Sequence, residues 1–155
     1  MCIKNLYAYV ALLAVCICFP ALAKPSAIGV VDAWAPPSLS QSAGVAYITL
    51  RNDATSDDVL THITANAITD QAELHTHKTD ARGVVRMRRL KAMALPARGV
   101  LVMTPGAKHL MFFALKKPLR DGENFQVTCY FKHAAPLVIR VPISTARLLE
   151  HIKAR

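Results

Sequence analysis

Cysteine is scarce in this chain, and three of its four cysteines lie close to the N-terminus. If that segment is a cleaved signal peptide, as argued below, Cys2, Cys16 and Cys18 are removed and Cys129 is the only thiol left. No intramolecular disulfide can then form, so stability must come from an ordinary hydrophobic core. The remaining sequence has no Cys-x-x-Cys motif, which argues against a thiol oxidoreductase. Cys129 lies in an alternating apolar stretch and is expected to be a buried, inert strand residue.

Acidic residues are also few: the chain has 10 Asp and Glu against 19 Lys and Arg. Loss of Lys4 with the signal peptide leaves 18 minus 10, or +8. The basic residues are not interleaved with aromatic ones, so a nucleic-acid-binding surface is disfavoured. They are expected on solvated strand faces and turns, with docking to an acidic partner or to anionic lipid as the alternative. Two groups stand out: Arg86, Arg88, Arg89 and Lys91, and Lys116, Lys117 and Arg120.

The sequence has one long apolar run, from Leu6 to Leu22, close to the N-terminus. Lys4 precedes the run, and Ala21-Leu22-Ala23 fits the small-x-small rule for signal peptidase. We therefore predict that residues 1–23 form a signal peptide cleaved after Ala23. The mature 132 residues (155 minus 23) are enough for one domain outside the cytoplasm.

Two alternatives to a cleaved signal peptide are disfavoured by particular residues. An uncleaved membrane anchor fits poorly, because Pro20 interrupts the apolar run and Lys24-Pro25 resembles a mature start. A lipoprotein fits less well than simple cleavage, because Val15 stands where a lipobox needs a small residue before Cys16.

Apolar alternation and turn residues predict β structure in almost all of the mature chain. Many short strands with turns such as Asp80-Ala81-Arg82-Gly83 between them indicate an all-β, antiparallel Greek-key sandwich or barrel. We expect a single domain over residues 24–144, then a tail over 145–155 that could form a short helix without convincing caps. The predicted strands are 29–34, 45–51, 59–65, 71–77, 84–90, 100–103, 109–114, 124–131 and 137–141.

Two histidines and two methionines, His75, Met87, His109 and Met111, form a set suited to one metal state. Thioether sulfur favours monovalent copper and holds zinc, magnesium or calcium poorly. In a strand His109 and Met111 project to the same face, and a hairpin closed around residues 80–83 would bring His75 and Met87 together. Taken singly, however, a strand methionine is more often core filler, and a strand histidine is more often a surface or hydrogen-bonded residue.

The spacing of these residues resembles the periplasmic copper chaperone family PCuAC. The family pattern is a histidine, about ten residues, a methionine, twenty-one residues, then His-x-Met. Twenty-one residues separate Met87 from His109 here, and Met111 completes the motif. The resemblance runs from about Val31 to Val141, and its other landmarks are Val31-Asp32-Ala33-Trp34-Ala35, Ala46-Tyr47-Ile48-Thr49-Leu50-Arg51-Asn52, Glu73-Leu74-His75, Leu95-Pro96-Ala97, Pro105-Gly106 and Leu115-Lys116-Lys117-Pro118-Leu119.

The resemblance implies a cupredoxin-like β-sandwich that carries Cu(I) in the periplasm and is not an enzyme. The copper ligands would be His75, Met87, His109 and Met111. The acceptor would be cytochrome c oxidase subunit II or one of its assembly factors. The remaining alternative is a non-catalytic exported sandwich that serves interaction, copper storage or copper tolerance.

One departure from the family pattern concerns the first histidine. Eleven residues separate His75 from Met87, one more than the pattern has, and the turn around Arg82-Gly83 could absorb the extra residue. His77 is the rival, because residues two apart in a strand share a face. It could replace His75, join it as an additional ligand, or bind divalent copper. We favour His75, since Glu73-Leu74 aligns it with the family.

Overall fold

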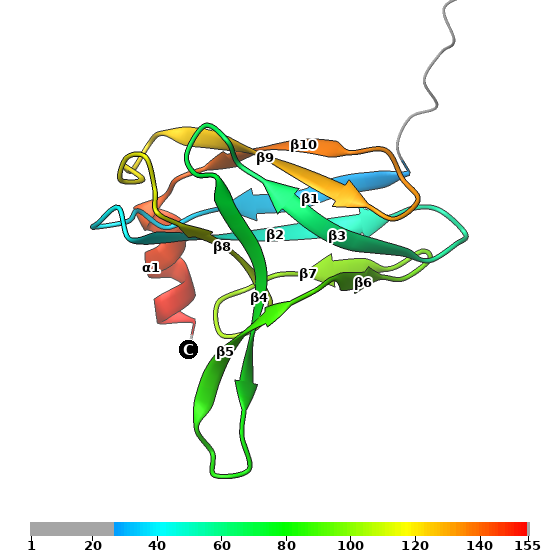
Figure 1. Ribbon diagram of the computed structural model, residues 1–155, viewed down its shortest axis with the longest axis horizontal. Helices are drawn as coiled ribbons and strands as arrows, with labels where there is room; N and C mark the ends of the chain where they lie inside the picture. Colours follow the sequence, from blue (N-terminus) through cyan, green and yellow to red (C-terminus); the bar gives the residue numbers. More distant parts are fainter. Residues whose placement is uncertain (1–26, 155) are drawn as a thin grey trace, which may run out of the picture.

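The computed structural model describes residues 27–154, which form two antiparallel β-sheets packed face to face and one C-terminal helix (Figure 1). The larger sheet has the order β1-β2-β8-β4-β5, with β7 also paired to β2, and the smaller has the order β10-β9-β3-β6. The predicted all-β antiparallel sandwich is confirmed. The strands are β1 Ile28–Trp34, β2 Ala43–Asn52, β3 Asp58–Thr64, β4 Gln71–Thr79, β5 Val85–Leu90, β6 Met93–Leu95, β7 Val100–Val102, β8 His109–Phe113, β9 Asn124–Phe131 and β10 Leu137–Pro142.

The core lies between the two sheets and is built by alternation along each strand. On β8, Leu110 and Phe112 are fully buried among the core residues. His109 and Met111, which alternate with them along the strand, project to the opposite face. Cys129 on β9 belongs to this core and is a free, buried cysteine. Burial raises the pKa of the Cys129 thiol to about 12, so the thiol stays protonated and unreactive at neutral pH.

Two local features differ from the sequence predictions. The short strand β6 was not predicted, because three residues followed by Pro96 carry too little alternation to reveal a strand. The C-terminal segment forms helix α1, Thr145–Lys153. The prediction that its ends lack convincing caps was wrong at the N-terminal end, where the Ser144 hydroxyl accepts a hydrogen bond from the Arg147 N–H at 3.2 Å.

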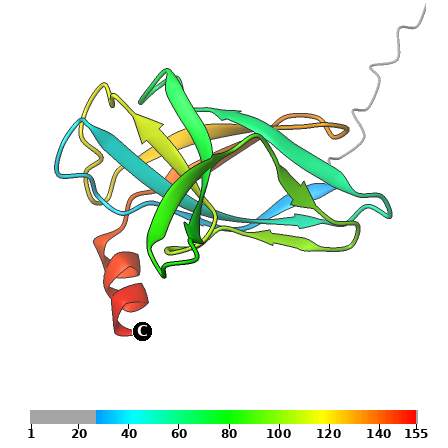
Figure 2. The ribbon, with the colours of Figure 1, turned by 60° about the horizontal axis from the view of Figure 1, so that its bottom comes forward.

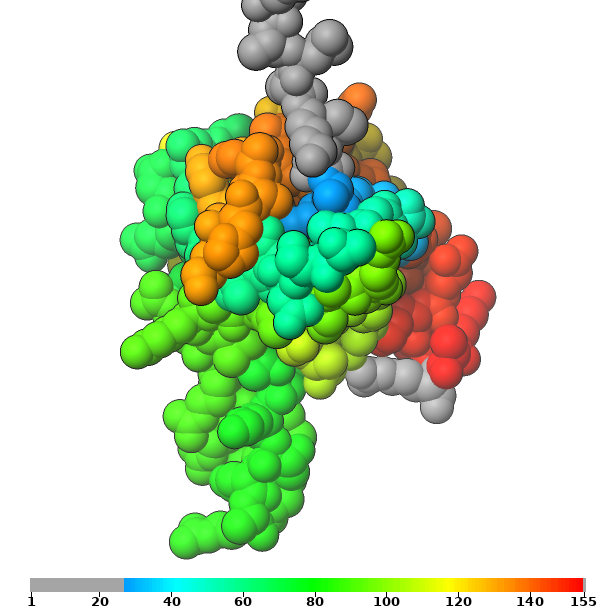
Figure 3. All heavy atoms as spheres, turned by 90° about the vertical axis from the view of Figure 1, so that its right-hand side faces the viewer, coloured from blue at the N-terminus to red at the C-terminus, as the bar shows by residue number. Residues whose placement is uncertain are grey.

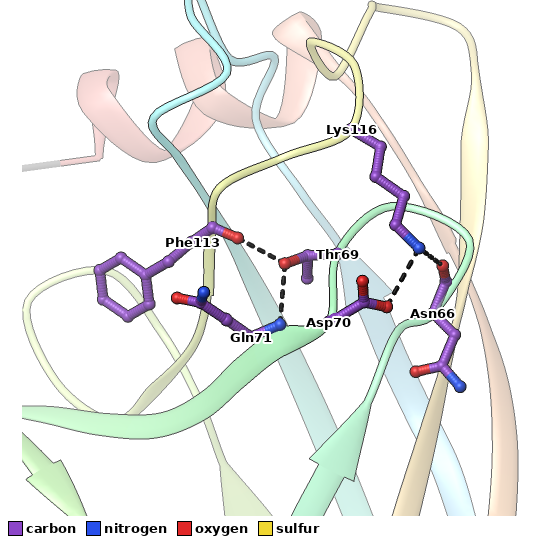
Figure 4. Close-up of polar contacts among 6 residues, drawn as sticks. All are labelled: Asn66, Thr69, Asp70, Gln71, Phe113 and Lys116. Atoms are coloured by element: carbon purple, nitrogen blue, oxygen red, sulfur yellow. Dashed lines mark hydrogen bonds and ion pairs between the residues drawn. The ribbon is translucent and has the colours of Figure 1, made fainter.

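A polar cluster fixes the start of β4 against the end of β8 (Figure 4). The Thr69 hydroxyl donates to the Phe113 carbonyl and accepts from the Gln71 N–H at 2.9 Å. Lys116 donates to the Asn66 carbonyl at 2.8 Å and to the Asp70 carboxylate at 3.0 Å. A slip by one residue would turn every side chain of β4 to the other face. The cluster therefore helps to fix the register that places His75 opposite His109.

The β4–β5 hairpin extends beyond the body of the sandwich (Figures 1 and 3). Its turn is the predicted one: the Asp80 carboxylate accepts from the N–H groups of Arg82 and Val84 at 2.9 and 3.0 Å. Gly83 has a φ of +80°, a left-handed conformation that glycine adopts without strain. Among the described strands, β5 lies at the edge of the sheet and pairs with β4 alone. Its residues from Val85 to Arg89 are all exposed.

The predicted signal peptide, residues 1–23, lies outside the described residues. Within residues 27–154, no helix is long and apolar enough to cross a membrane.

Candidate metal centre

The predicted ligands share the outer face of the larger sheet, on the side away from the core. His109 on β8 lies directly opposite His75 on β4, and Met111 lies opposite Glu73. On the hairpin it is His77, not His75, that lies opposite Met87, while His75 lies opposite Arg89. Directly opposed residues point to one face, as do residues two apart. Strand pairing therefore gathers three imidazoles and two thioethers on a single face.

His109 is held in an orientation that leaves one ring nitrogen for a ligand. The residue is buried, and its Nδ1 lies 2.9 Å from the Ala107 carbonyl oxygen. A carbonyl can only accept, so Nδ1 carries the proton and Nε2 is left with a lone pair. The Ala107 carbonyl also accepts the backbone N–H of His77 at 3.3 Å. The Ala107 carbonyl thus orients the His109 ring and also binds the backbone of β4 at His77.

Burial lowers the pKa of His109, and the nearby His77 and His75 lower it further, against an opposing effect of the Ala107 hydrogen bond. The unfolded chain then binds more protons than the folded one as pH falls below the ordinary histidine value of about 6.5. The contribution of His109 to the free energy of unfolding is therefore fully present above that pH and declines below it. We expect the metal-free protein to unfold at lower urea at pH 5 than at pH 7.5. His109→Leu should reduce this difference, and an unchanged pH dependence in the variant would contradict the assignment.

His75 is held by a carboxylate on its own strand. Its Nε2 lies 2.8 Å from Glu73 Oε2, and the other oxygen of Glu73 lies 3.3 Å from an Arg89 guanidinium nitrogen. The Nδ1 atom of His75 is buried and has no hydrogen-bond partner within the described residues. Metal-binding histidines commonly donate one ring N–H to a carboxylate and bind through the other nitrogen. The arrangement of Glu73 and His75 fits that pattern.

His77 is placed at least as well as His75 for a site that contains His109. The ring centroids of His77 and His109 are 5.0 Å apart, against 6.0 Å for His75 and His109. Metal–imidazole bonds of about 2 Å put a ring centroid roughly 3 Å from the metal, so two rings that share a metal are separated by roughly 4.5–6 Å. Both pairs meet this condition. The Nδ1 atom of His77, like that of His75, is buried and has no hydrogen-bond partner among residues 27–154.

The two methionines differ in exposure. Met111 is half-buried on β8, between Val45 of β2 and Glu73 of β4. Met87 lies on the edge strand and is 44% exposed. One thioether is therefore fixed within the sheet, and the other is open to solvent and to a partner. Within residues 27–154, no group of three or more His, Cys, Asp or Glu is arranged to hold a metal ion by itself.

An aromatic row that the sequence analysis did not single out borders the site. Trp34 and Tyr47 lie opposite each other on β1 and β2, with ring centroids 4.8 Å apart, and Tyr47 lies 6.5 Å from His109. The Arg147 guanidinium of α1 lies over the Trp34 ring at 5.6 Å. Alternation along β2 puts Tyr47 outside the core, but only the β2–β8 register places it beside His109. The row therefore meets the imidazole cluster at His109, through Tyr47.

The family described as "Putative lipoprotein LpqE-like" matches residues 28–143, which span both sheets. Putative lipoprotein Lxx21020 of Leifsonia xyli is 27% identical over 100 residues, which cover 63% of this chain and 58% of that protein. Uncharacterized protein RP573 of Rickettsia prowazekii is 27% identical over 124 residues, which cover 77% of this chain and 67% of that protein. The chain thus spans less than two thirds of the first of these relatives.

Solved structures of PCuAC domains have the same fold. The copper-bound PCuAC domain from PmoF2 superposes with a TM-score of 0.63 at 21% identity, covering 76% of this chain and 92% of that one. The apo PCuAC domain from PmoF1 gives 0.62 at 19% identity, covering 76% and 93%. The CuI form of DR1885 from Deinococcus radiodurans gives 0.57 at 25% identity, covering 80% and 81%.

Proposed function

The chain belongs to the LpqE-like family, and from that premise and the geometry of its histidines and methionines we propose that it is a copper chaperone. It binds one monovalent copper ion on the outer face of the larger sheet and passes the ion to an acceptor protein. The ligands are His75, Met87, His109 and Met111, with His77 within reach as a third imidazole. Copper is the cargo of the protein, and the protein itself carries out no covalent chemistry.

The observation that carries this proposal is the state of the imidazole nitrogens beside the two thioethers. His75 and His77 each have a buried Nδ1 without a hydrogen-bond partner in the described part of the chain. Leaving buried polar atoms unpaired costs about 1–3 kcal/mol each, and a metal ion would remove that cost. The other nitrogens of His75 and His109 are held by Glu73 and by the Ala107 carbonyl.

The donor set suits a carrier of reduced copper. Neutral thioethers stabilise the monovalent ion and need no deprotonation, while they bind it less tenaciously than thiolates. Cys129 provides no thiolate, because it lies in the core and burial raises its pKa to about 12. A solvent-exposed Met87 supplies a ligand that an acceptor can displace. Binding followed by release, without turnover, follows from these properties.

The setting of the function is the periplasm, which the chain reaches by means of the signal peptide predicted over residues 1–23. The acceptor is cytochrome c oxidase subunit II or one of its assembly factors, as in the PCuAC proteins that the sequence motif resembles. The alternative is storage of copper under stress, in which the same site holds the ion without a dedicated acceptor. Loss of oxidase copper on deletion of the gene, without loss of copper tolerance, would favour delivery over storage.

The test of copper binding is an anaerobic titration of residues 24–155 with monovalent copper against a competing chelator. We expect one tightly bound ion per chain, and X-ray absorption should show mixed sulfur and nitrogen neighbours. Treatment with an oxidant that converts Met87 and Met111 to sulfoxides should weaken binding, because the sulfoxide is polar and loses the soft thioether. A metal shell of nitrogen and oxygen alone would refute the thioether ligands.

A further inference from the structure

The outer half of the β4–β5 hairpin, residues 78–88, is here called the arm. The space-filling view shows the hairpin projecting from the sandwich on the face in view (Figure 3). In the view turned by 60°, the bottom of Figure 1 comes forward and the hairpin lies in front of the sandwich (Figure 2). Met87 is 44% exposed, Val84 46% and Val85 61%. Both faces of the arm and the outer edge of β5 are therefore accessible to a partner.

The arm is strongly basic. It carries four basic residues, Lys78, Arg82, Arg86 and Arg88, and one acidic residue, Asp80, which gives 4 minus 1, or +3, over eleven residues. Asp80 is turned inward to cap the hairpin turn and lies 3.3 Å from Arg86 Nε. Lys78, Arg82 and Arg88 make no ion pair within the described part of the chain. The arm thus presents nearly uncompensated positive charge.

Strand register places two of these basic residues directly opposite each other. Lys78 and Arg86 lie directly opposite each other, and like charges at opposed positions destabilise an antiparallel pair. Arg86 and Arg88 flank Met87 in sequence but point to the other face. One face therefore carries the copper ligand, and the reverse face carries a basic row in which only Arg86 has an acidic neighbour, Asp80, among residues 27–154. A local arrangement that costs stability with so little compensation in the fold is expected where function requires it.

We propose that the arm is the docking surface for the copper acceptor, and that the acceptor presents acidic side chains beside its copper ligands. The inference rests on the proposed copper function. An acidic partner relieves the repulsion between Lys78 and Arg86 and speeds encounter by electrostatic attraction. The acidic partner also contacts Met87, the exposed copper ligand, before it contacts the other ligands. In the first step of the transfer, the copper–sulfur bond to Met87 breaks and a copper–thiolate bond to an acceptor cysteine forms. The bonds to His75, His109 and Met111 then break as further acceptor ligands replace them. The thiol proton goes to solvent, and copper stays monovalent.

The experiment uses two synthetic acceptor peptides that carry the same pair of cysteines, one flanked by glutamates and the other by glutamines. Transfer of monovalent copper from the loaded protein to each peptide is followed anaerobically by stopped flow at low and high salt. We expect transfer to the acidic peptide to be about tenfold faster at low salt. The advantage should shrink as salt screens the charges.

Two triple variants with the same net charge separate the arm from overall charge. Lys78→Gln/Arg86→Gln/Arg88→Gln should abolish the preference for the acidic peptide. Arg120→Gln/Lys132→Gln/Lys153→Gln, which changes exposed residues away from the arm, should retain it. None of the six is a proposed ligand, so both variants should load copper like the unmodified protein. Equal loss in both variants, or no loss in the arm variant, would overturn the docking role.

A copper-free measurement distinguishes failure of docking from failure of the copper function. Fluorescence anisotropy of the labelled acidic peptide reports its binding to the unloaded protein, with the same two variants as controls. If the protein binds no copper, the proposed function fails while this measurement still decides whether the arm recognises acidic chains. Edge strands also carry charges to prevent self-pairing. An arm variant that aggregates but shows unchanged peptide binding would assign the arginines to that role and refute docking. Binding to phosphatidylglycerol vesicles, but not to the peptide, would refute a protein partner.

Discussion

His109→Ala should lower the affinity for monovalent copper by more than about 100-fold, since loss of a partner that merely orients a ligand already costs 10–100-fold. His109 is the ring that both other imidazoles approach, His77 at 5.0 Å and His75 at 6.0 Å. It is buried, so a water molecule cannot easily take its place. Chelator competition under anaerobic conditions measures the change. His62→Ala, which removes an exposed histidine stacked on Tyr130, is the matched control.

The same titration separates His75 from His77. Each has an unpartnered Nδ1 on the shared face, so either can serve when the other is absent. We expect His75→Ala and His77→Ala each to weaken binding less than His109→Ala does. The double variant should approach the loss seen for His109. If His75→Ala alone matches His109→Ala, His77 is not a substitute ligand. If His109→Ala has no more effect than His62→Ala, the site is not on this face.

Local patterns revealed those parts of the site that depend on one strand or one turn. Alternation over residues 109–113 places His109 and Met111 on one face, and the turn chemistry of Asp80 and Gly83 predicts the hairpin. The pairing of His77, rather than His75, with Met87 depends on how many residues the turn takes up. That register is fixed by the turn and by the Thr69 cluster at the far end of β4, and alternation alone does not specify it.

The sequence alone does not predict contacts between segments that are far apart along the chain. The Ala107 carbonyl that orients His109 belongs to a turn in which the Ala107 N–H donates to the Thr104 carbonyl at 3.1 Å, and the turn residues alone do not indicate its contact with the His109 ring. Tyr47 reaches His109 only because β2 and β8 are neighbours in the sheet. Glu73 belongs to the segment that aligns His75 with the family pattern, but its contact with His75 Nε2 depends on side-chain rotamers. These residues set the orientation and solvent access of the ligands, so the sequence predicts the donor set better than it predicts the properties of the site.

The second large effect concerns the core side of the ligand strand. Phe112 on β8 is fully buried in the core between the two sheets, and it packs edge-to-face on Phe125 of β9 with ring centroids 5.5 Å apart. Phe112→Ala should lower the free energy of unfolding by about 3–5 kcal/mol. That is a large part of the roughly 5–15 kcal/mol that holds a domain together. Phe113→Ala, which shortens the half-buried neighbour on the outer face, should cost clearly less. Urea denaturation of the metal-free proteins measures both.

Copper should partly reverse the defect of Phe112→Ala, because a ligand that binds only the folded state stabilises it in proportion to the logarithm of its concentration over Kd. At 1,000 times Kd the gain is about 4 kcal/mol, comparable with the loss from the cavity. Monovalent copper should therefore raise the urea midpoint of Phe112→Ala far more than that of Phe112→Ala/His109→Ala, whose gain at the same concentration is about 1.4 kcal/mol or less after a 100-fold loss of affinity. Equal rescue of both variants would mean that copper binds elsewhere. Rescue of neither would mean that the site exists only when Phe112 holds β8 in place, and that the core face of this strand positions the ligands on its other face.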